Sequence, residues 1–249
     1  MLILALETTG KYGSAAVIDD SGRVSVSRSD NEMNHLRDII AISSEALEMS
    51  GRKKAELTHV AASRGPGSFT GIRIGVTTAR TLAQMLEIPC IGVSSLEAMA
   101  LRQAHEGGCT GRLIVPLINA RRHQVYAGAW QETEGRVEKA FDDRQYMIEE
   151  ILEILDKENF LSQENPVVFT GDGIDAYDGI IEETLPAGTY ALSDESLRYQ
   201  DAGSVAEVAM SKALSGAVLS YGELLPDYMR LAEAEQKLKD GTLSPRIKK

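Results

Sequence analysis

The glycine-rich stretch at residues 64–75, RGPGSFTGIRIG, has the residue types of an anion-binding turn. It follows a short apolar run at 59–62 and precedes a helical pattern at about 70–86. A strand, a glycine-rich turn and a helix present backbone N–H groups to an anion in many α/β proteins. This order of elements makes phosphate the first ligand to consider.

The residues of the turn argue against both common phosphate motifs. A P-loop needs a Lys and a Ser or Thr after its last glycine, and Ile72 and Arg73 stand there instead. A dinucleotide fingerprint needs a third glycine where this chain has Thr70. The alternative is a tight turn that sets the entry angle of a packed helix.

Three further groups of residues could take part in binding. Glu7, Thr8 and Thr9 end the first expected strand, where an acid and two hydroxyls could hold a phosphate or its magnesium. The alternative is that the threonines terminate the strand. Gly-Asp-Gly at 171–173 and Arg-Arg at 121–122 also follow expected strands, but a plain turn and a solvated basic pair explain them equally.

The histidines and cysteines lack the spacing of a metal or nucleophile site. None of the four histidines has a second one three or four residues away, so a zinc-binding helix is absent from the pattern. G-x-S-x-G is also missing, and Cys90 and Cys109 form no metal motif and indicate a reducing compartment. We therefore expect no catalytic residue, no bound metal and no cofactor.

The elements that would position these residues are readable from periodicity. The first part of the chain predicts strands at 2–7, 13–19, 23–28, 59–62 and 88–93, and helices at 34–50, 70–86 and 94–103. In the helix at 34–50, one face carries Leu36, Ile40, Ser43 and Leu47. Ser94 and Glu97 fit a capping box for the third helix.

A Gly-Gly break at 107–108 precedes a second set of elements, which indicates a second lobe. The pattern predicts strands at 113–118, 123–130 and 167–170 and a helix at 146–157. A helix at 204–214 and a charged segment at 229–240 close the chain, and 241–249 look frayed. The expected units are a first lobe at 1–104, a second lobe at 105–203, and a C-terminal segment at 204–249 that packs back on the lobes.

The helix at 70–86 has two faces without charge. One is an ordinary core stripe, and the other is made of small and apolar residues. This second face either packs inside the domain or meets another chain. Its members are Gly71, Ile74, Gly75, Thr78, Leu82 and Met85.

Composition limits the classes of partner. The 249 residues carry a net charge of -11, which disfavours a long nucleic-acid groove, because bare phosphate would be repelled. Any contact with nucleic acid is then local or made through a more basic partner. The apolar run at residues 1–6 is too short for a signal or a membrane span, so we expect a cytoplasmic protein without a membrane contact.

Several segments together resemble the TsaB (YeaZ) family: ILALETTGKYGSAAVIDDSG, RGPGSFTGIRIG, IPCIGVSSLEAMA, INARRHQVYAGAW and PDYMR. The resemblance covers nearly the whole chain. It implies an α/β protein with the actin-like ATPase (ASKHA, ribonuclease H-like) fold, in which two lobes each hold a mixed β-sheet flanked by helices. This agrees with the two lobes expected from the pattern.

The resemblance also implies a function. Members of the family are scaffold and activator subunits, without catalysis of their own, for threonylcarbamoylation of adenosine 37 (t6A37) in tRNAs that read codons beginning with adenine. The implied partners are the catalytic paralogue TsaD and the ATPase TsaE, with tRNA contacted only indirectly and a homodimer formed when the chain is alone. Alternatives are a metallopeptidase of the glycoprotease (M22) type and a small-molecule kinase of the same fold.

The resemblance further implies where sites should lie. TsaD binds metal through an H-x-x-x-H helix, and the two histidine positions fall on Ser95 and Met99 here. Glu7 stands where Asp is commoner in the family, so Glu7, Thr8 and Thr9 are expected to be a vestigial phosphate site. The partner interface is expected on the helix at 34–50, on the second uncharged face of the helix at 70–86, and on the turn before it: Pro66, Gly67, Ser68, Phe69 and Thr70.

Overall fold

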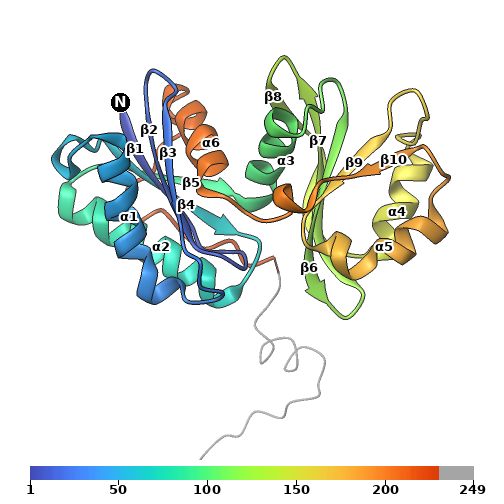
Figure 1. Cartoon of the computed structure of the whole chain (residues 1–249), viewed down its shortest axis with the longest axis horizontal. Helices are drawn as coiled ribbons and strands as arrows, with labels where there is room; N and C mark the ends of the chain where they lie inside the picture. Colours follow the sequence, from blue (N-terminus) through green and yellow to red (C-terminus); the bar gives the residue numbers. More distant parts are fainter. Residues whose placement is uncertain (230–249) are drawn as a thin grey trace, which may run out of the picture.

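The computed structural model describes residues 1–229 and has two lobes, each built on a five-stranded mixed sheet (Figure 1). The first sheet has the strand order β3-β2-β1-β4-β5, and its first three strands are antiparallel. β4 and β5 then continue it in parallel with β1. Its strands are β1 (Leu2–Glu7), β2 (Ser14–Asp19), β3 (Val24–Arg28), β4 (His59–Gly65) and β5 (Cys90–Ser94).

The second sheet has the order β10-β9-β6-β7-β8 and repeats this plan, with an antiparallel meander followed by parallel strands. Its strands are β6 (Leu113–Arg121), β7 (Gln124–Thr133), β8 (Arg136–Met147), β9 (Val167–Thr170) and β10 (Tyr190–Leu192). Three of the elements in this lobe were not predicted. These are β8, β10 and the helix α5 (Gly173–Thr184).

Each sheet is buried on both faces. In β1, Leu2, Leu4 and Leu6 point to the core under α1 (His35–Ser50) and α2 (Phe69–Leu86), while Ile3 and Ala5 point to the opposite core. This alternation is the period-2 geometry of a strand. On the opposite face lies α6 (Ala202–Leu214), which returns from the end of the second lobe. In the second lobe, α4 (Ile148–Lys157) and α5 cover one face of the sheet.

The helix α3 (Ser95–Glu106) lies between the two sheets and joins the lobes (Figure 1). On one side of α3, Ala98 and Leu101 pack with α6 in the core of the first lobe. On the other side, Leu96 and Met99 pack with Trp130 of the second lobe. Its start agrees with the prediction, because the Ser94 side chain accepts a hydrogen bond from the Glu97 N–H. Two short 3-10 helices, Lys54–Glu56 and Glu195–Leu197, complete the regular structure.

The face of α1 that carries Leu36, Ile40, Ser43 and Leu47 is only partly covered by the core, since Ser43 is buried and Leu47 packs against it while the other two do not. Ile39, Ile42, Ser43 and Ala46 are buried, whereas Leu36 and Ile40 are 76% and 57% exposed. The apolar pattern of this helix covers more than one face, and the sheet can bury only the side that it contacts. Leu36, Ile40 and Met49 therefore remain largely in solvent. The charged segment expected at 229–240, apart from its first residue, and the end of the chain at 241–249 lie outside the described residues.

Candidate functional site

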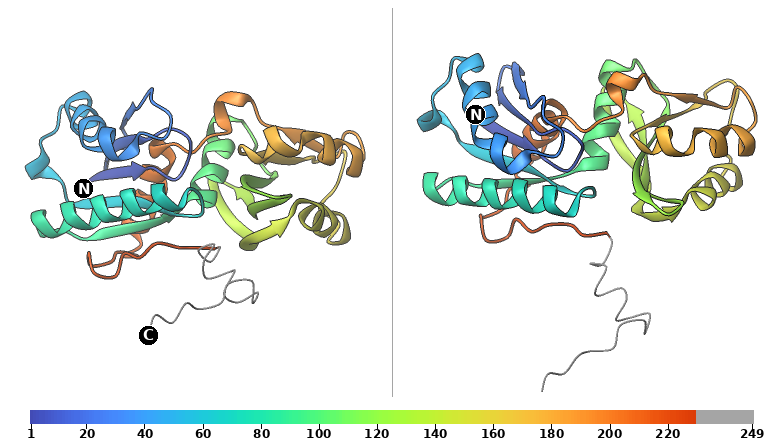
Figure 2. Two further views of the ribbon diagram at one scale, coloured as in Figure 1. Left: turned by 90° about the horizontal axis from the view of Figure 1, so that it is seen from below. Right: turned by 60° about the horizontal axis from the view of Figure 1, so that its bottom comes forward.

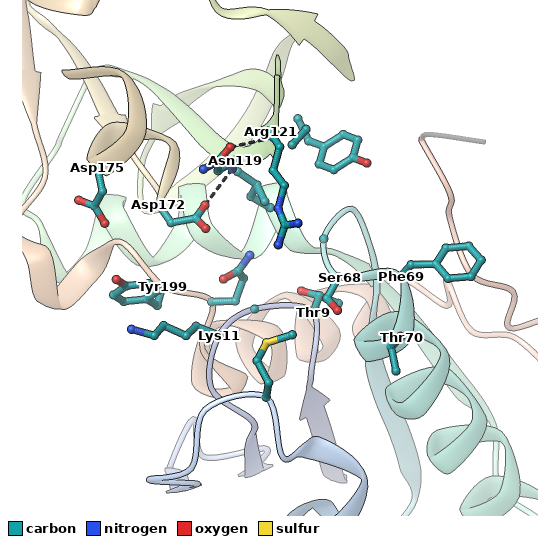
Figure 3. Close-up of a pocket in the computed structure, with 17 residues that line it drawn as sticks. Thr9, Lys11, Ser68, Phe69, Thr70, Asn119, Arg121, Asp172, Asp175 and Tyr199 are labelled. Atoms are coloured by element: carbon teal, nitrogen blue, oxygen red, sulfur yellow. Dashed lines mark hydrogen bonds between the residues drawn. The ribbon is translucent and has the colours of Figure 1, made fainter. Parts of the chain in front are cut away.

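A cleft of about 740 Å³ separates the two lobes (Figure 3). One wall is formed by the loop after β1 and the start of α2, and the other by the end of β6, the start of α5 and the segment before α6. Arg121 reaches from the second lobe toward the two loops of the first lobe that hold Thr9 and Ser68. The residues that line the cleft include Thr9, Lys11, Ser68, Phe69, Thr70, Asn119, Arg121, Asp172, Asp175 and Tyr199.

The glycine-rich turn is pressed onto the end of β1. The Ser68 N–H donates to the Thr9 carbonyl at 2.8 Å, and the Thr8 hydroxyl donates to the Gly71 carbonyl at 2.7 Å. A Cβ atom on Gly71 would lie 1.9 Å from the backbone carbonyl oxygen of Thr8. A Cβ atom on Gly67 would lie 2.5 Å from the backbone carbonyl oxygen of Thr9. The glycines of this turn thus permit close backbone packing, which was the alternative to phosphate binding.

The expected vestigial phosphate residues point into the first lobe. Glu7 is fully buried and accepts hydrogen bonds from the Thr9 backbone N–H, the Thr9 hydroxyl and the Ser63 hydroxyl. The Thr9 hydroxyl lies 3.0 Å from the Ser95 hydroxyl, which extends the network. Burial raises the pKa of Glu7 despite these bonds. Only Thr9 of the three also lines the cleft, so the acid and hydroxyls do not form one open site.

Replacement of Glu7 by Gln tests whether the ionised form of this buried acid lowers the free energy of unfolding. The pKa of Glu7 is raised above its ordinary 4.5 by burial. The folded protein therefore binds this proton more tightly than the unfolded chain, and its stability falls as pH rises above that ordinary value. We expect the wild type to lose stability relative to Glu7→Gln between pH 4.5 and pH 7, measured by urea unfolding. A constant difference between the two proteins would contradict the expectation.

The two positions that the resemblance aligns with metal ligands of TsaD are both buried. Ser95 belongs to the hydroxyl network, and Met99 packs in the apolar cluster between the lobes. A hydroxyl and a thioether are poor substitutes for two imidazoles at a divalent metal. Within residues 1–229 no group of three or more His, Cys, Asp and Glu side chains is placed to hold a metal ion.

The structure brings Arg121 and Asp172 to the same cleft, which the sequence did not indicate. Asp172 accepts a hydrogen bond from the Asn119 N–H at 2.9 Å, and burial raises its pKa. This carboxylate stands at the N-terminal end of α5 and connects that helix to β6. The Gly-Asp-Gly stretch is therefore a junction between elements rather than a free turn. A strand-end motif on its own could not reveal which distant strand faces it.

The histidines serve separate contacts. The His35 ring lies 3.0 Å from the Gly10 carbonyl, and the His105 ring lies between the Glu207 carboxylate and the Gly135 carbonyl. In the second lobe, the His123 Nδ1 atom lies 3.5 Å from the Glu149 carboxylate. These neighbours are hydrogen-bond or ion-pair partners within the chain.

The expected partner interface is only partly at the surface. Pro66, Gly71 and Gly75 are buried, because the turn and the first half of α2 pack on β1, so this part of the expected interface is corrected. Ile74 and Leu82 are half-buried against the first core, and Gly67, Ser68 and Thr78 are also half-buried. Phe69 is 38% exposed and Met85 is 74% exposed.

Exposed side chains of both helices lie on the outer surface of α1 and α2. On α2 these include Phe69 and Met85, and on α1 they include Leu36 and Ile40. Both helices pack on the same face of the first sheet (Figure 1). We call the docking face the exposed residues Leu36, Ile40, Thr70, Thr77, Thr81 and Met85. It offers apolar and hydroxyl groups without a charge among its members. No helix in residues 1–229 combines the length and the apolar character that a membrane crossing requires.

Comparisons with known proteins agree with this architecture. The model of the TsaD family, described as tRNA N6-adenosine threonylcarbamoyltransferase, matches residues 29–238. The solved structure of YeaZ from Pseudomonas aeruginosa aligns with a TM-score of 0.74 at 23% identity and covers 91% of this chain and 99% of that one. The expected fold, two lobes that each hold a mixed β-sheet flanked by helices, is thus confirmed.

Relatives found by sequence share a higher percentage of identical residues with this chain than the solved YeaZ structure does. The tRNA threonylcarbamoyladenosine biosynthesis protein TsaB of Bacillus subtilis is 34% identical over 95% of this chain and 97% of its own length. The TsaB protein of Haemophilus influenzae is 28% identical over 96% of this chain and 97% of its own length. Since identity at this level extends over almost the full length of both proteins, the chain belongs to the TsaB (YeaZ) family.

Proposed function

We propose that this chain is a non-catalytic subunit required for threonylcarbamoylation of adenosine 37 in tRNA, and that it acts by pairing with a TsaD-type catalytic subunit. Its relatives carry the name of that biosynthetic process, and the TsaD family model spans most of its length. Two proteins of one fold can pair through equivalent surfaces. The proposal extends to a TsaE-type ATPase as a further partner, to a cytoplasmic location, and to a homodimer when the catalytic partner is missing.

The observation that carries the proposal is the contrast between the two surfaces of the first lobe. Next to the cleft residue Thr9, Glu7 is buried inside the lobe and already accepts three hydrogen bonds, and the positions that the resemblance aligns with the metal ligands of TsaD are the buried Ser95 and Met99. On the outside, Leu36, Ile40 and Met85 are all more than half exposed. Large apolar side chains left exposed on two helices that cover the same sheet face are candidates for a contact with another protein. We propose residues 1–104 as the partner-binding lobe, with 105–203 as the second lobe.

A reconstituted reaction tests the proposal directly. The mixture contains the threonylcarbamoyl-adenylate synthase, the TsaD-type and TsaE-type subunits, tRNA, threonine, bicarbonate and ATP, and formation of t6A is measured by nucleoside mass spectrometry. We expect omission of this chain to reduce modification to background and its return to restore it. Full modification without it would refute the required role.

The isolated chain provides the complementary measurement. We expect no cleavage of peptide substrates and no ATP hydrolysis above the buffer rate when it is assayed alone. Stoichiometric zinc or iron together with peptidase activity would instead favour the glycoprotease alternative. Hydrolysis of ATP that is lost on replacement of Glu7 or Thr9 would favour the kinase alternative.

A further inference from the structure

The last described segment lies on the first lobe and completes it (Figure 2). We call residues 219–229 the C-terminal strap. Leu219 exchanges two backbone hydrogen bonds with Cys90 of β5, at 2.7 and 2.8 Å, and Leu224 is fully buried in the core under α2. The Asp227 N–H then donates to the Arg64 carbonyl at 2.7 Å. The strap thereby reaches the glycine-rich turn from the far end of the sequence.

The strap explains one glycine of that turn. Gly65 has φ +121°, and a Cβ on it would lie 2.5 Å from the Asp227 carbonyl oxygen. Arg64 and Asp227 also form an ion pair at 3.6 Å. Two segments that are far apart in sequence, the turn at 64–71 and the strap, therefore form one packed unit at the start of α2.

This unit fixes the side chain of Arg73. The rings of Phe69 and Tyr228 are 4.6 Å apart, and the Arg73 guanidinium lies 4.0 Å from the centre of the Phe69 ring. Its Nε atom donates to the Tyr228 hydroxyl at 2.9 Å. An arginine stacked on one ring and hydrogen-bonded to a second has lost much of the rotational freedom that an exposed arginine normally keeps.

The fixed guanidinium retains its binding capacity. Arg73 is exposed, and its one hydrogen bond within residues 1–229 uses Nε, so the terminal N–H groups have no described acceptor. Arg73 lies beside Thr70 and Thr77 of the docking face on α2. Pre-organised arginines beside aromatic rings are typical residues of high energetic importance in protein interfaces, because binding them costs little further entropy.

We propose that Arg73, held by Phe69 and Tyr228, is the specificity anchor of the docking face and binds a carboxylate of the TsaD-type subunit through its terminal N–H groups. This inference rests on the proposed function. The planar fork suits a carboxylate in a two-point contact. Arg73 is an exposed cation without an ion-pair partner among residues 1–229, so at this point the face is complementary to an acid of the partner even though the chain as a whole carries a net charge of -11. The strap is then a positioning element for the interface.

The experiment measures the dissociation constant of the full-length chain with the TsaD-type subunit by calorimetry at two salt concentrations. We expect Arg73→Ala to weaken binding by about tenfold or more and to reduce its salt dependence. Arg73→Lys should restore little, because an ammonium lacks the fork. Tyr228→Phe keeps the ring and loses the hydroxyl, and should fall between the wild type and Arg73→Ala. Arg136→Ala, at an exposed arginine of the second lobe, is the matched control and should bind as the wild type does.

The other outcomes separate the failures. If the wild type binds and Arg73→Ala binds equally well with the same thermal midpoint, the anchor is refuted while the proposed function stands. If the wild type itself does not bind, the proposed function fails and the anchor with it. Two results would assign Arg73 to another occupant and overturn the inference. One is a defect in tRNA capture with normal protein pairing, and the other is a loss of the Arg73 effect when residues 230–249 are deleted.

Discussion

Replacement of Leu36 by Asp, or of Met85 by Lys, should abolish pairing with the TsaD-type subunit while the fold survives. Both side chains are about three-quarters exposed in the chain alone. Leu36 lies in the first turn of α1 and Met85 in the last turn of α2. An acid at a helix start and a base at a helix end interact favourably with the helix dipole, so neither change should lower the stability of the monomer.

In the complex the same charges would be removed from water without a designed ion-pair partner. Leaving a charge buried and unpaired costs about 3 kcal/mol or more, which corresponds to a loss of about 100-fold in affinity. The dissociation constant from calorimetry and the thermal midpoint of each variant are the two measurements. Leu192→Asp, an exposed leucine of the second lobe, serves as the matched control and should bind normally. Normal binding by both Leu36→Asp and Met85→Lys would place the interface elsewhere on the molecule.

Gly71→Ala should be the most damaging single-methyl change in the first lobe. The added Cβ would lie 1.9 Å from the Thr8 carbonyl oxygen, and this oxygen belongs to backbone at the end of a central strand. Neither β1 nor the first turn of α2 can move without disturbing the core that both share. We expect a loss of about 3 kcal/mol or more, because overpacking against rigid backbone exceeds the gain in helix propensity.

Gly179→Ala is the control for this prediction. It makes the same glycine-to-alanine change in a helix, but without a clash of the added Cβ with a neighbouring backbone. Gly179 lies in α5, is exposed, and would place its Cβ in open space. Here the ordinary preference of a helix for alanine should stabilise the protein by up to about 1 kcal/mol. Urea unfolding with a shared slope gives both values. If the two variants shifted the midpoint by similar amounts, close packing would not be the reason for Gly71.

Periodicity predicted most of the first lobe, and its failures have a physical cause. The strands at 2–7 and 167–170 match the structure within one residue, because continuous apolar runs occur where a strand is buried on both faces. β8 has mostly exposed and half-buried residues at the edge of its sheet, so its sequence lacks such a run. β10 is only three residues long. Pattern recognition has little to detect in either case.

The faces of the helices could not be derived in the same way. In α2, the small residues Gly71 and Gly75 and the apolar Ile74 and Met85 belong to one uncharged sector of the sequence. The structure divides this sector. The two glycines pack against the end of β1, whereas Met85 is exposed to solvent. A hydrophobic pattern indicates which side chains can be buried, but it does not indicate which other element of the fold packs against them.

Residue types alone established what this chain lacks: paired histidines, a nucleophile motif, and the lysine of a phosphate loop. They also carried enough of the family pattern to imply the two-lobed fold. Tertiary structure decided the rest, including the burial of Glu7 away from the cleft and the meeting of Arg73 with Tyr228 across 155 positions. Local sequence limits the conformations of its own segment, whereas contacts between distant segments depend on the packing of the complete chain.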